Sequence, residues 1–205
     1  MELTIIDKIK KTIKTIFSFI IHPILTFKLS SEKHKGSYFI LGRRIRINRP
    51  DLIHLGYNIE ICDNARILCV EEYKGQNYRP KVQIGHNVCI GFNFSLLVAE
   101  KVTIEDYVLI ASNVLISSEN HGMDPLISKS YTGQPLIAKP VHIGMGCWLG
   151  EKSMIMPGVS LGKKCIVATG AVVTKSFPDY CLLAGIPAKC IKKYDLQQRR
   201  WLSCD

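Results

Sequence analysis

Aliphatic residues recur at every sixth position over long stretches of this chain. The longest run begins at Ile143 and ends at Val173, and shorter runs begin at Ile84 and Ile104. The in-phase residues are Ile84, Ile90, Leu96, Ile104, Ile110, Ile116, Ile143, Leu149, Ile155, Leu161, Val167 and Val173. A period of six does not fit an α-helix, whose period is about 3.6 residues. Because six is even, a strand with this repeat turns the same face inward at every step. The pattern therefore predicts short stacked strands.

Two further positions are coupled to the aliphatic one. The next residue is often glycine, and seven of the 15 glycines take this place: Gly42, Gly56, Gly85, Gly91, Gly144, Gly150 and Gly162. Four residues after the aliphatic comes a smaller apolar residue, such as Val88, Val114 or Cys165. We expect the aliphatic to point inward, the smaller residue to fill a corner, and glycine to ease the turn beside it. Such coils stack in parallel because their backbone groups hydrogen-bond to the coils above and below.

Segments at both ends lie outside the repeat. Residues 3–21 place apolar side chains on one face and lysines mainly on the other, which predicts an amphipathic helix that Pro23 ends. Two interpretations of this helix stay open: it caps the open end of the stack, or it makes a peripheral contact with an anionic membrane. The polar tail from Tyr194 to Trp201 predicts a short C-terminal helix.

The repeat is interrupted twice. Residues 71–81 break the period and are expected to form a loop. A longer loop, rich in Ser, Gly and Pro, is expected at about residues 117–140. Loops that leave a rigid repeat often carry functional residues. The predicted organisation is an N-terminal helical segment at 1–36, a repeat domain at 37–192 and a C-terminal tail at 193–205.

Charge and cysteine content narrow the functional classes. The net charge of +10 suggests an anionic partner, but nucleic acid is not expected because the chain has no aromatic-basic motif. The eight cysteines are scattered without a C-x-x-C pair or a tight His/Cys cluster, so neither a zinc site nor a redox dithiol is expected. Free thiols, no cleavable secretory signal and no apolar run long enough to span a bilayer together indicate a cytoplasmic protein.

His121 is the strongest catalytic candidate. It lies just past the run that ends at Ile116, at the root of the longer loop. An imidazole titrates near neutral pH and can accept a proton from a hydroxyl group. His86 and His142 occupy outward positions of the repeat and are expected to be solvated.

The chain resembles the hexapeptide-repeat acyltransferases, and among them the sugar and polysaccharide O-acetyltransferases. The resemblance covers about residues 37–192 and rests on the repeat, on Asn120-His121-Gly122, and on the restart of the repeat from Val141 to Gly150. It implies an all-β fold, a left-handed parallel β-helix with three hexapeptides in each triangular coil. It also implies a homotrimer with active sites between subunits, acetyl-CoA as co-substrate, no metal, and His121 as the general base.

Further site residues follow from this resemblance. The segments Ala168–Pro178 and Ala184–Lys189 are similar to the CoA-binding segments of the family. The implied CoA-binding residues are Trp148, Gly150, Thr169, Thr174, Lys175, Lys189 and Lys192, and the implied acceptor-binding residues are Asn93 and Asn120. Trp148 would flank the pantetheine arm, and a backbone N–H near Gly150 or Glu151 would donate to the thioester oxygen. For Asn93, a structural role at a coil corner stays open.

The reaction that the resemblance implies is direct transfer of an acetyl group from acetyl-CoA to a sugar hydroxyl, as in the making of a capsule or lipopolysaccharide precursor. Glu119 or Asp124 could orient the imidazole. A drug acetyltransferase of the same fold and a non-catalytic β-helix scaffold remain alternatives. A carbonic anhydrase built on this repeat is a weaker one, because it needs three histidine zinc ligands, and His86, His121 and His142 are not expected to meet that geometry.

Overall fold

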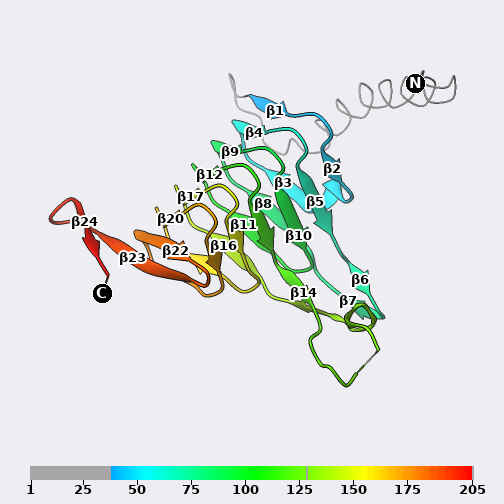
Figure 1. Ribbon diagram of the computed structural model, residues 1–205. Helices are drawn as coiled ribbons and strands as arrows, with labels where there is room; N and C mark the ends of the chain where they lie inside the picture. Colours follow the sequence, from blue (N-terminus) through cyan, green and yellow to red (C-terminus); the bar gives the residue numbers. More distant parts are fainter. Residues whose placement is uncertain (1–37, 128, 205) are drawn as a thin grey trace, which may run out of the picture.

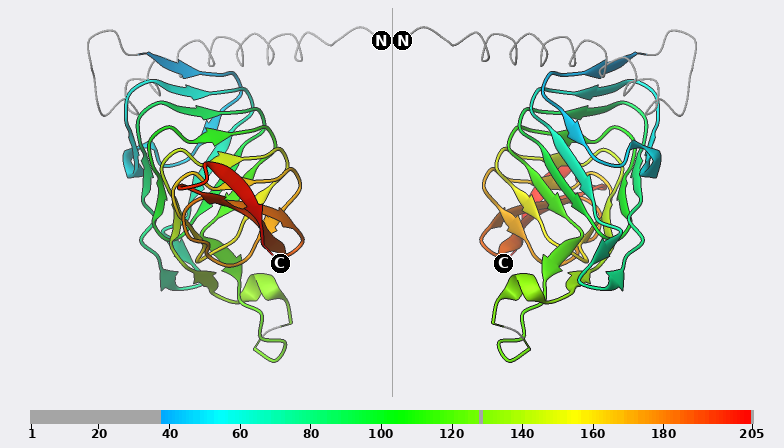
Figure 2. Two further views of the ribbon diagram at one scale, coloured as in Figure 1. Left: turned by 90° about the vertical axis from the view of Figure 1, so that its left-hand side faces the viewer. Right: turned by 90° about the vertical axis from the view of Figure 1, so that its right-hand side faces the viewer.

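The chain folds into a triangular prism of stacked coils (Figure 1 and Figure 2). The structure is a computed structural model that describes residues 38–127 and 129–204. Each complete coil contributes one short strand to each of three sheets, which we call faces A, B and C in the order in which a complete coil passes through them. Five successive coils contribute a strand to all three faces, from β3–β4–β5 to β19–β20–β21.

The strands of the three faces are short. Face A contains β3 (Ile53–Leu55), β8 (Val82–Ile84), β11 (Val102–Ile104), β16 (Val141–Ile143) and β19 (Ser160–Leu161). Face B contains β1 (Phe39–Leu41), β4 (Ile59–Ile61), β9 (Val88–Ile90), β12 (Leu109–Ile110), β17 (Trp148–Leu149), β20 (Ile166–Val167), β22 (Cys181–Gly185), β23 (Ala188–Asp195) and β24 (Arg200–Ser203). Face C contains β2 (Arg46–Ile47), β5 (Arg66–Cys69), β10 (Ser95–Val98), β13 (Leu115–Ser117), β18 (Met154–Ile155) and β21 (Val172–Val173).

The in-phase aliphatic residues form the core of the prism. All twelve, from Ile84 to Val173, are at most 3% exposed. The smaller residues Val88, Val114 and Cys165 fill the corners and are at most 1% exposed. Neighbouring coils pair in register, as Ile104 does with Ile143, so that like side chains stack along the length of the prism. The inward positions predicted from the repeat are confirmed.

The role expected for the in-phase glycines is wrong. None of the seven has a positive φ, so none is needed for the turn itself. Instead, a Cβ at Gly91 would lie 2.7 Å from the Ser112 nitrogen, and a Cβ at Gly150 would lie 2.6 Å from the Val167 oxygen. Glycine is required because the next coil passes this close. The left-handed turn comes two residues later, for example at Asn93 and Asn113, with φ of 57° and 62°.

The C-terminal tail forms a β-hairpin, and the predicted short helix is wrong. β23 pairs antiparallel with β22, and β24 pairs antiparallel with β23, which extends face B past the last coil. In the connecting turn, Asp195 Oδ1 accepts the N–H groups of Gln197 and Gln198 at 2.8 and 2.7 Å. The open edge of face B offers hydrogen-bond partners to an extended chain, which outweighs the weak helix propensity of the tail.

Both interruptions of the repeat leave the prism at the corner where face C leads into face A. The first contains the hairpin of β6 (Glu72–Tyr73) and β7 (Gln76–Asn77), and the second contains that of β14 (Glu119–His121) and β15 (Leu136–Ala138) (Figure 1). The longer loop is therefore an ordered hairpin at its base.

Helical structure in residues 38–127 and 129–204 is limited to two short 3-10 turns, η1 (Pro50–Leu52) and η2 (Tyr131–Gly133). No helix in these ranges has the length and hydropathy needed to cross a membrane. The amphipathic helix predicted at residues 3–21 lies outside the described residues.

Candidate active site

The root of the long hairpin is fixed to the prism by two serines. The side chain of Ser118 is fully buried, and its Oγ accepts the N–H groups of Ala99 and Glu100, each at 3.1 Å. The hydroxyl of Ser117 donates to the Glu119 carbonyl at 2.6 Å. These bonds provide partners for backbone N–H and C=O groups at the corner where the chain leaves the sheet. They set the direction in which the chain leaves the prism just before His121.

A buried glutamine closes the hairpin beyond His121. Gln134 is 2% exposed, and its amide donates to the Asp124 carbonyl at 2.7 Å and accepts the Asp124 N–H at 3.1 Å. The Gly122 N–H also donates across the hairpin to the Pro135 carbonyl at 3.0 Å. His121, paired with Leu136, thus lies on a braced strand.

The shorter hairpin contacts the longer one through two tyrosines that the sequence analysis did not single out. The Tyr73 ring meets the His121 ring edge-on, with 5.5 Å between centroids, and its hydroxyl donates to the Thr132 carbonyl at 2.8 Å. The Tyr78 hydroxyl accepts the Leu136 N–H at 2.6 Å and lies 3.2 Å from the Leu136 carbonyl. The contact with Tyr73 positions the imidazole of His121, and the rest of the ring is exposed to solvent.

We expect Tyr78→Phe to loosen the long hairpin, because the Leu136 N–H loses its partner and a buried amide left unpaired costs about 1–3 kcal/mol. Amide exchange in β14 and β15 should become faster, and exchange in the core strands should not change. Hydrogen exchange measured by mass spectrometry checks this. Tyr107→Phe, at an exposed corner, is the matched control. Equal exchange in β14 for both variants would contradict the bracing role.

Of the two carboxylates expected to orient His121, the structure favours Glu119. Residues 119 and 121 of one strand point to the same side. Glu119 is half-buried; burial raises the pKa of its carboxyl group, and the charge of His121 acts to lower it. The Asp124 carboxylate is engaged elsewhere, because its Oδ1 accepts the Leu126 N–H at 2.8 Å.

The two asparagines expected at the acceptor site are placed differently. Asn93 belongs to a ladder along a coil corner, where it accepts from Asn64 at 3.0 Å and donates to Asn113 at 3.1 Å. This is the structural role that the sequence left open. Asn120 is exposed, but it lies next to His121 on β14 and therefore points to the opposite side of the hairpin.

Trp148 lies on the outer surface of face B. It is 48% exposed and stands in register between Leu109 and Ile166. Together with Lys164, Tyr180 and the C-terminal hairpin it lines a hollow of about 400 Å³. Tyr194 and Trp201 of that hairpin pack edge-on, 5.4 Å apart. The hollow combines aromatic walls with a cation.

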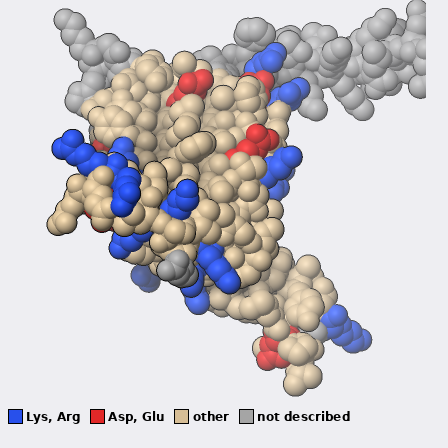
Figure 3. All heavy atoms as spheres, turned by 60° about the vertical axis from the view of Figure 1, so that its left-hand side comes forward, with Lys and Arg blue, Asp and Glu red and all other residues tan. Residues whose placement is uncertain are grey.

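The remaining CoA-binding candidates are divided between this side of the molecule and the corner that carries the long hairpin. Thr169 is exposed at the corner between faces B and C. Thr174 and Lys175 are exposed just after β21, at the corner between faces C and A, two coils beyond β13. The Lys175 ammonium lies 5.6 Å from the centre of the Phe177 ring. Lys189 and Lys192 are exposed on β23. Figure 3 shows Lys and Arg side chains gathered over the C-terminal strands, a surface suited to phosphate groups.

Gly150 has a structural role in the chain. Its N–H donates to the Val167 carbonyl at 2.8 Å, so this group is used within the β-helix and is not a donor for a thioester oxygen. Of the two backbone N–H groups expected to donate to the thioester oxygen, the Gly150 N–H is excluded and the Glu151 N–H remains a candidate.

One chain does not bring its candidate residues into one site. His121 projects from the corner between faces C and A, whereas Trp148 and β23 belong to face B. In a triangular prism, face B is the side opposite that corner (Figure 2). The imidazole and the aromatic and basic surface therefore point away from each other.

The other histidines among the described residues, His54, His86 and His142, lie on face A and its edge. The backbone N–H of His86 donates to the Asp106 carboxylate at 2.7 Å. The His86 ring stacks on the Tyr57 ring, with 4.0 Å between the ring centroids. His142 Nε2 lies 3.4 Å from a Glu105 oxygen. Within the part of the chain that the structure describes, no three His, Cys, Asp or Glu side chains are grouped as metal ligands would be.

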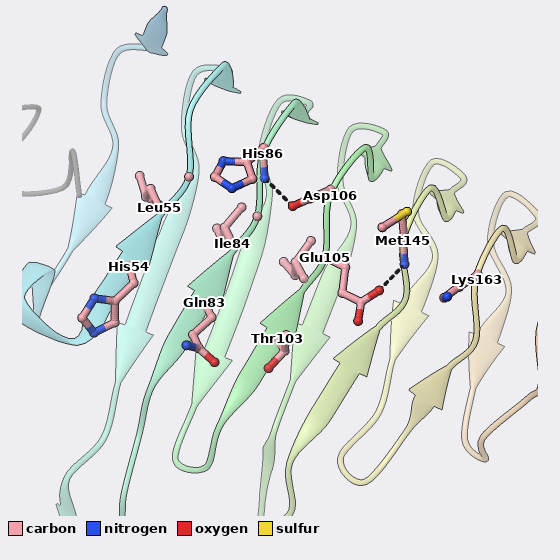
Figure 4. Close-up of a pocket in the computed structure, with 13 residues that line it drawn as sticks. His54, Leu55, Gln83, Ile84, His86, Thr103, Glu105, Asp106, Met145 and Lys163 are labelled. Carbon is pink, nitrogen blue, oxygen red and sulfur yellow. Dashed lines mark hydrogen bonds between the residues drawn. The ribbon is translucent and has the colours of Figure 1, made fainter. Parts of the chain in front are cut away.

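A hollow of about 520 Å³ runs across the outside of face A (Figure 4). Gln83 and Thr103 line it from neighbouring strands, with His54 at one end and Lys163 at the other (Figure 4). Glu105 accepts the Met145 N–H there at 2.8 Å. The lining mixes these polar side chains with apolar residues such as Leu55, Ile84 and Met145. Met145 follows β16, the strand that comes directly after the long hairpin.

Comparison with known proteins places these features in context. The profile of the hexapeptide repeat of succinyl-transferase matches residues 140–175. Galactoside O-acetyltransferase from Escherichia coli K12 is 31% identical over 125 residues, covering 61% of this chain and 60% of the relative. The putative lipopolysaccharide biosynthesis O-acetyl transferase WbbJ of the same organism is 39% identical over 108 residues, covering 50% of this chain and 55% of the relative. The chain thus spans at most about three fifths of the length of these curated relatives.

Solved structures share the fold. A mutant of AntD, an N-acyltransferase from Bacillus cereus, in complex with dTDP-4-amino-4,6-dideoxyglucose and coenzyme A, is 21% identical with a TM-score of 0.62, covering 87% of this chain and 90% of that one. A maltose O-acetyltransferase from Clostridium difficile 630 is 23% identical with a TM-score of 0.55, covering 87% of each chain. The repeat, the prism and these likenesses confirm that the chain is a left-handed β-helix protein of hexapeptide repeats, similar to the acyltransferases built on that repeat.

Proposed function

We propose that this protein is an acetyltransferase that moves the acetyl group of acetyl-CoA to a hydroxyl group of a sugar. The observation that carries the proposal is the exposed imidazole of His121 on a braced hairpin, in a chain whose opposite side offers aromatic and basic groups. The likeness to galactoside O-acetyltransferase and to WbbJ supports a sugar acceptor, which belongs to a capsule or lipopolysaccharide precursor in this proposal. The hollow on face A has Gln83, Thr103 and Glu105 among its lining residues, which offer hydrogen-bond partners to the hydroxyl groups of a sugar.

In this mechanism the acceptor hydroxyl gives its proton to the imidazole of His121 while its oxygen attacks the thioester carbonyl. The carbon–sulfur bond then breaks, and the CoA sulfur leaves with the proton that the imidazole held. Glu119, on the same side of β14, stabilises the imidazolium that forms in between. The N–H of Glu151 donates to the oxygen on which charge builds up. The products are an acetylated sugar and free CoA.

In this proposal the protein is a homotrimer, in which the His121 side of one prism faces the Trp148 side of its neighbour. His121 of one subunit faces Trp148 and the basic strands of the next, and a ring of three closes because each subunit uses both surfaces once. The aromatic hollow would hold the pantetheine arm, and exposed lysines would meet the phosphates of CoA. We place the protein in the cytoplasm, where acetyl-CoA is available.

A direct test measures the release of CoA thiol from acetyl-CoA with a panel of acceptors, together with the mass of the product. The expected result is release that depends on a saccharide and matches the acetyl groups gained by it. Acetylation of an aminoglycoside or another antibiotic, with no sugar acetylated, would favour a drug acetyltransferase. If no thiol is released and calorimetry detects no CoA binding, the result would favour the alternative of a non-catalytic β-helix scaffold.

The lysines make a separate prediction. We expect Lys175→Ala combined with Lys189→Ala to raise KM for acetyl-CoA about tenfold or more, because two charge-assisted contacts to phosphate are lost. The value of kcat should change little, since neither lysine touches the reacting atoms. Initial-rate kinetics at varied acetyl-CoA check this. Lys81→Ala, an exposed lysine before β8, is the matched control. An unchanged KM in the double variant would show that these lysines are merely solvated.

A further inference from the structure

The C-terminal hairpin brings together two cysteines that are far apart in the sequence. Cys190 lies on β23, and Cys204 follows β24. Their Sγ atoms are 3.2 Å apart, and both residues are half-buried. The Cys204 N–H donates to the Ile191 carbonyl at 3.0 Å, so the pairing of β23 with β24 continues up to the two thiols.

We propose that Cys190 and Cys204 are a modification site that forms a reversible disulfide by exchange with a small disulfide such as glutathione disulfide. One thiolate of the pair attacks a sulfur atom of the oxidant, which releases one glutathione thiol and leaves a mixed disulfide. The second thiolate attacks the protein sulfur of that mixed disulfide and releases the second glutathione. Two protein thiols lose two electrons and two protons, and one glutathione disulfide is reduced to two glutathione molecules.

The other cysteines are less suited to this reaction. Cys147, Cys165 and Cys181 are at most 2% exposed, inside the prism, and cannot meet an oxidant in solution. Cys89 is half-buried, and its burial, together with the Glu60 carboxylate 4.0 Å from its Sγ, raises the pKa of its thiol and disfavours the thiolate. Cys190 and Cys204 combine partial exposure with a thiol neighbour.

The location gives the disulfide a structural consequence. Among the described strands, β24 is the last strand of face B and pairs on one side only, with β23. A bond between Cys190 and Cys204 closes the loop that contains the whole turn and β24. It therefore fastens Trp201, which packs on Tyr194 and lines the hollow beside Trp148. Burial raises the pKa of the Cys190 thiol, so exchange should become faster as the pH rises.

The experiment equilibrates the full chain with glutathione and glutathione disulfide at graded ratios, quenches it in acid, alkylates free thiols, and maps the peptides by mass spectrometry. The expected result is a peptide pair joined through Cys190 and Cys204 and lighter by two hydrogen atoms, with both residues protected from alkylation. Amide exchange in β24 should slow by about two orders of magnitude, the factor expected for closing a loop of about 15 residues. These measurements do not depend on any catalytic activity.

Variants decide between this pair and other pairings. In Cys204→Ser, Cys190 should carry a glutathione adduct in place of the internal bond, and in Cys62→Ser, the matched half-buried control, the bond should form as in the natural chain. The proposal is overturned if Cys190 pairs with Cys181, if the bond joins two chains, or if both thiols stay alkylated at the most oxidising ratio. Since the natural chain is mapped directly, the result does not depend on how the variants fold.

Discussion

Replacing His121 with alanine is expected to lower kcat for acetyl transfer by about 10²–10⁴-fold, the range that a positioned general base contributes. The imidazole is exposed at the root of a hairpin held by Ser118 and Gln134, so its removal leaves the surrounding backbone bonds in place. The chain should therefore fold as before and bind acetyl-CoA with unchanged affinity. A loss confined to kcat would assign the imidazole to the chemical step.

The measurement is steady-state thiol release at a saturating concentration of the acceptor, with calorimetry for acetyl-CoA. In His121→Ala the release should fall because the group that takes the hydroxyl proton is missing. His142→Ala is the matched control: His142 lies on face A beside Glu105, and its loss should change kcat by no more than about twofold. Equal kcat values for the natural protein and His121→Ala would remove the assignment of the base.

Much of the prism could be predicted from the sequence because its core obeys a single local rule. Each in-phase aliphatic residue is buried by the coil above and the coil below, which carry the same residue type at the same position. The period therefore predicts the inward positions from Ile84 to Val173 without any knowledge of distant contacts. The position of His121 followed from the same rule, since a break in the period marks where the chain leaves the prism.

What the sequence did not predict depends on contacts between segments that do not share the period. Tyr73 and Tyr78 contact the long hairpin across nearly 60 residues of chain, and only the stacking of coils brings the two excursions to one corner. The tail was expected to be helical because its residues tolerate a helix. Instead, the free edge of β22 provides backbone hydrogen-bond partners, and β23 pairs with it as an antiparallel strand. Cys190 and Cys204 became neighbours through that same hairpin.

The division of the site between two sides of the prism leads to the second large effect. If His121 of one subunit works with Trp148 of the next, then His121→Ala and Trp148→Ala should each inactivate every site of its own trimer. A mixed trimer restores some sites, because a subunit with Trp148→Ala still supplies His121, and a neighbour with His121→Ala still supplies Trp148. For random assembly of equal amounts, about a quarter of the interfaces pair the two intact surfaces. Activity should thus recover to about a quarter of that of the natural protein.

The experiment refolds or co-expresses the two variants together and compares thiol release with that of each variant alone, with light scattering to confirm the trimer. The control mixes His121→Ala with the double variant His121→Ala, Trp148→Ala, in which no subunit supplies an imidazole, and its activity should stay at the background. Recovery in the first mixture and not in the second requires sites built from two chains, because no single chain in either mixture carries both residues. A mixture no more active than the average of its components, in particles shown to be mixed trimers, would mean that each prism works alone. In that case the imidazole on the corner between faces C and A would need a different partner for the thioester from the aromatic surface of face B.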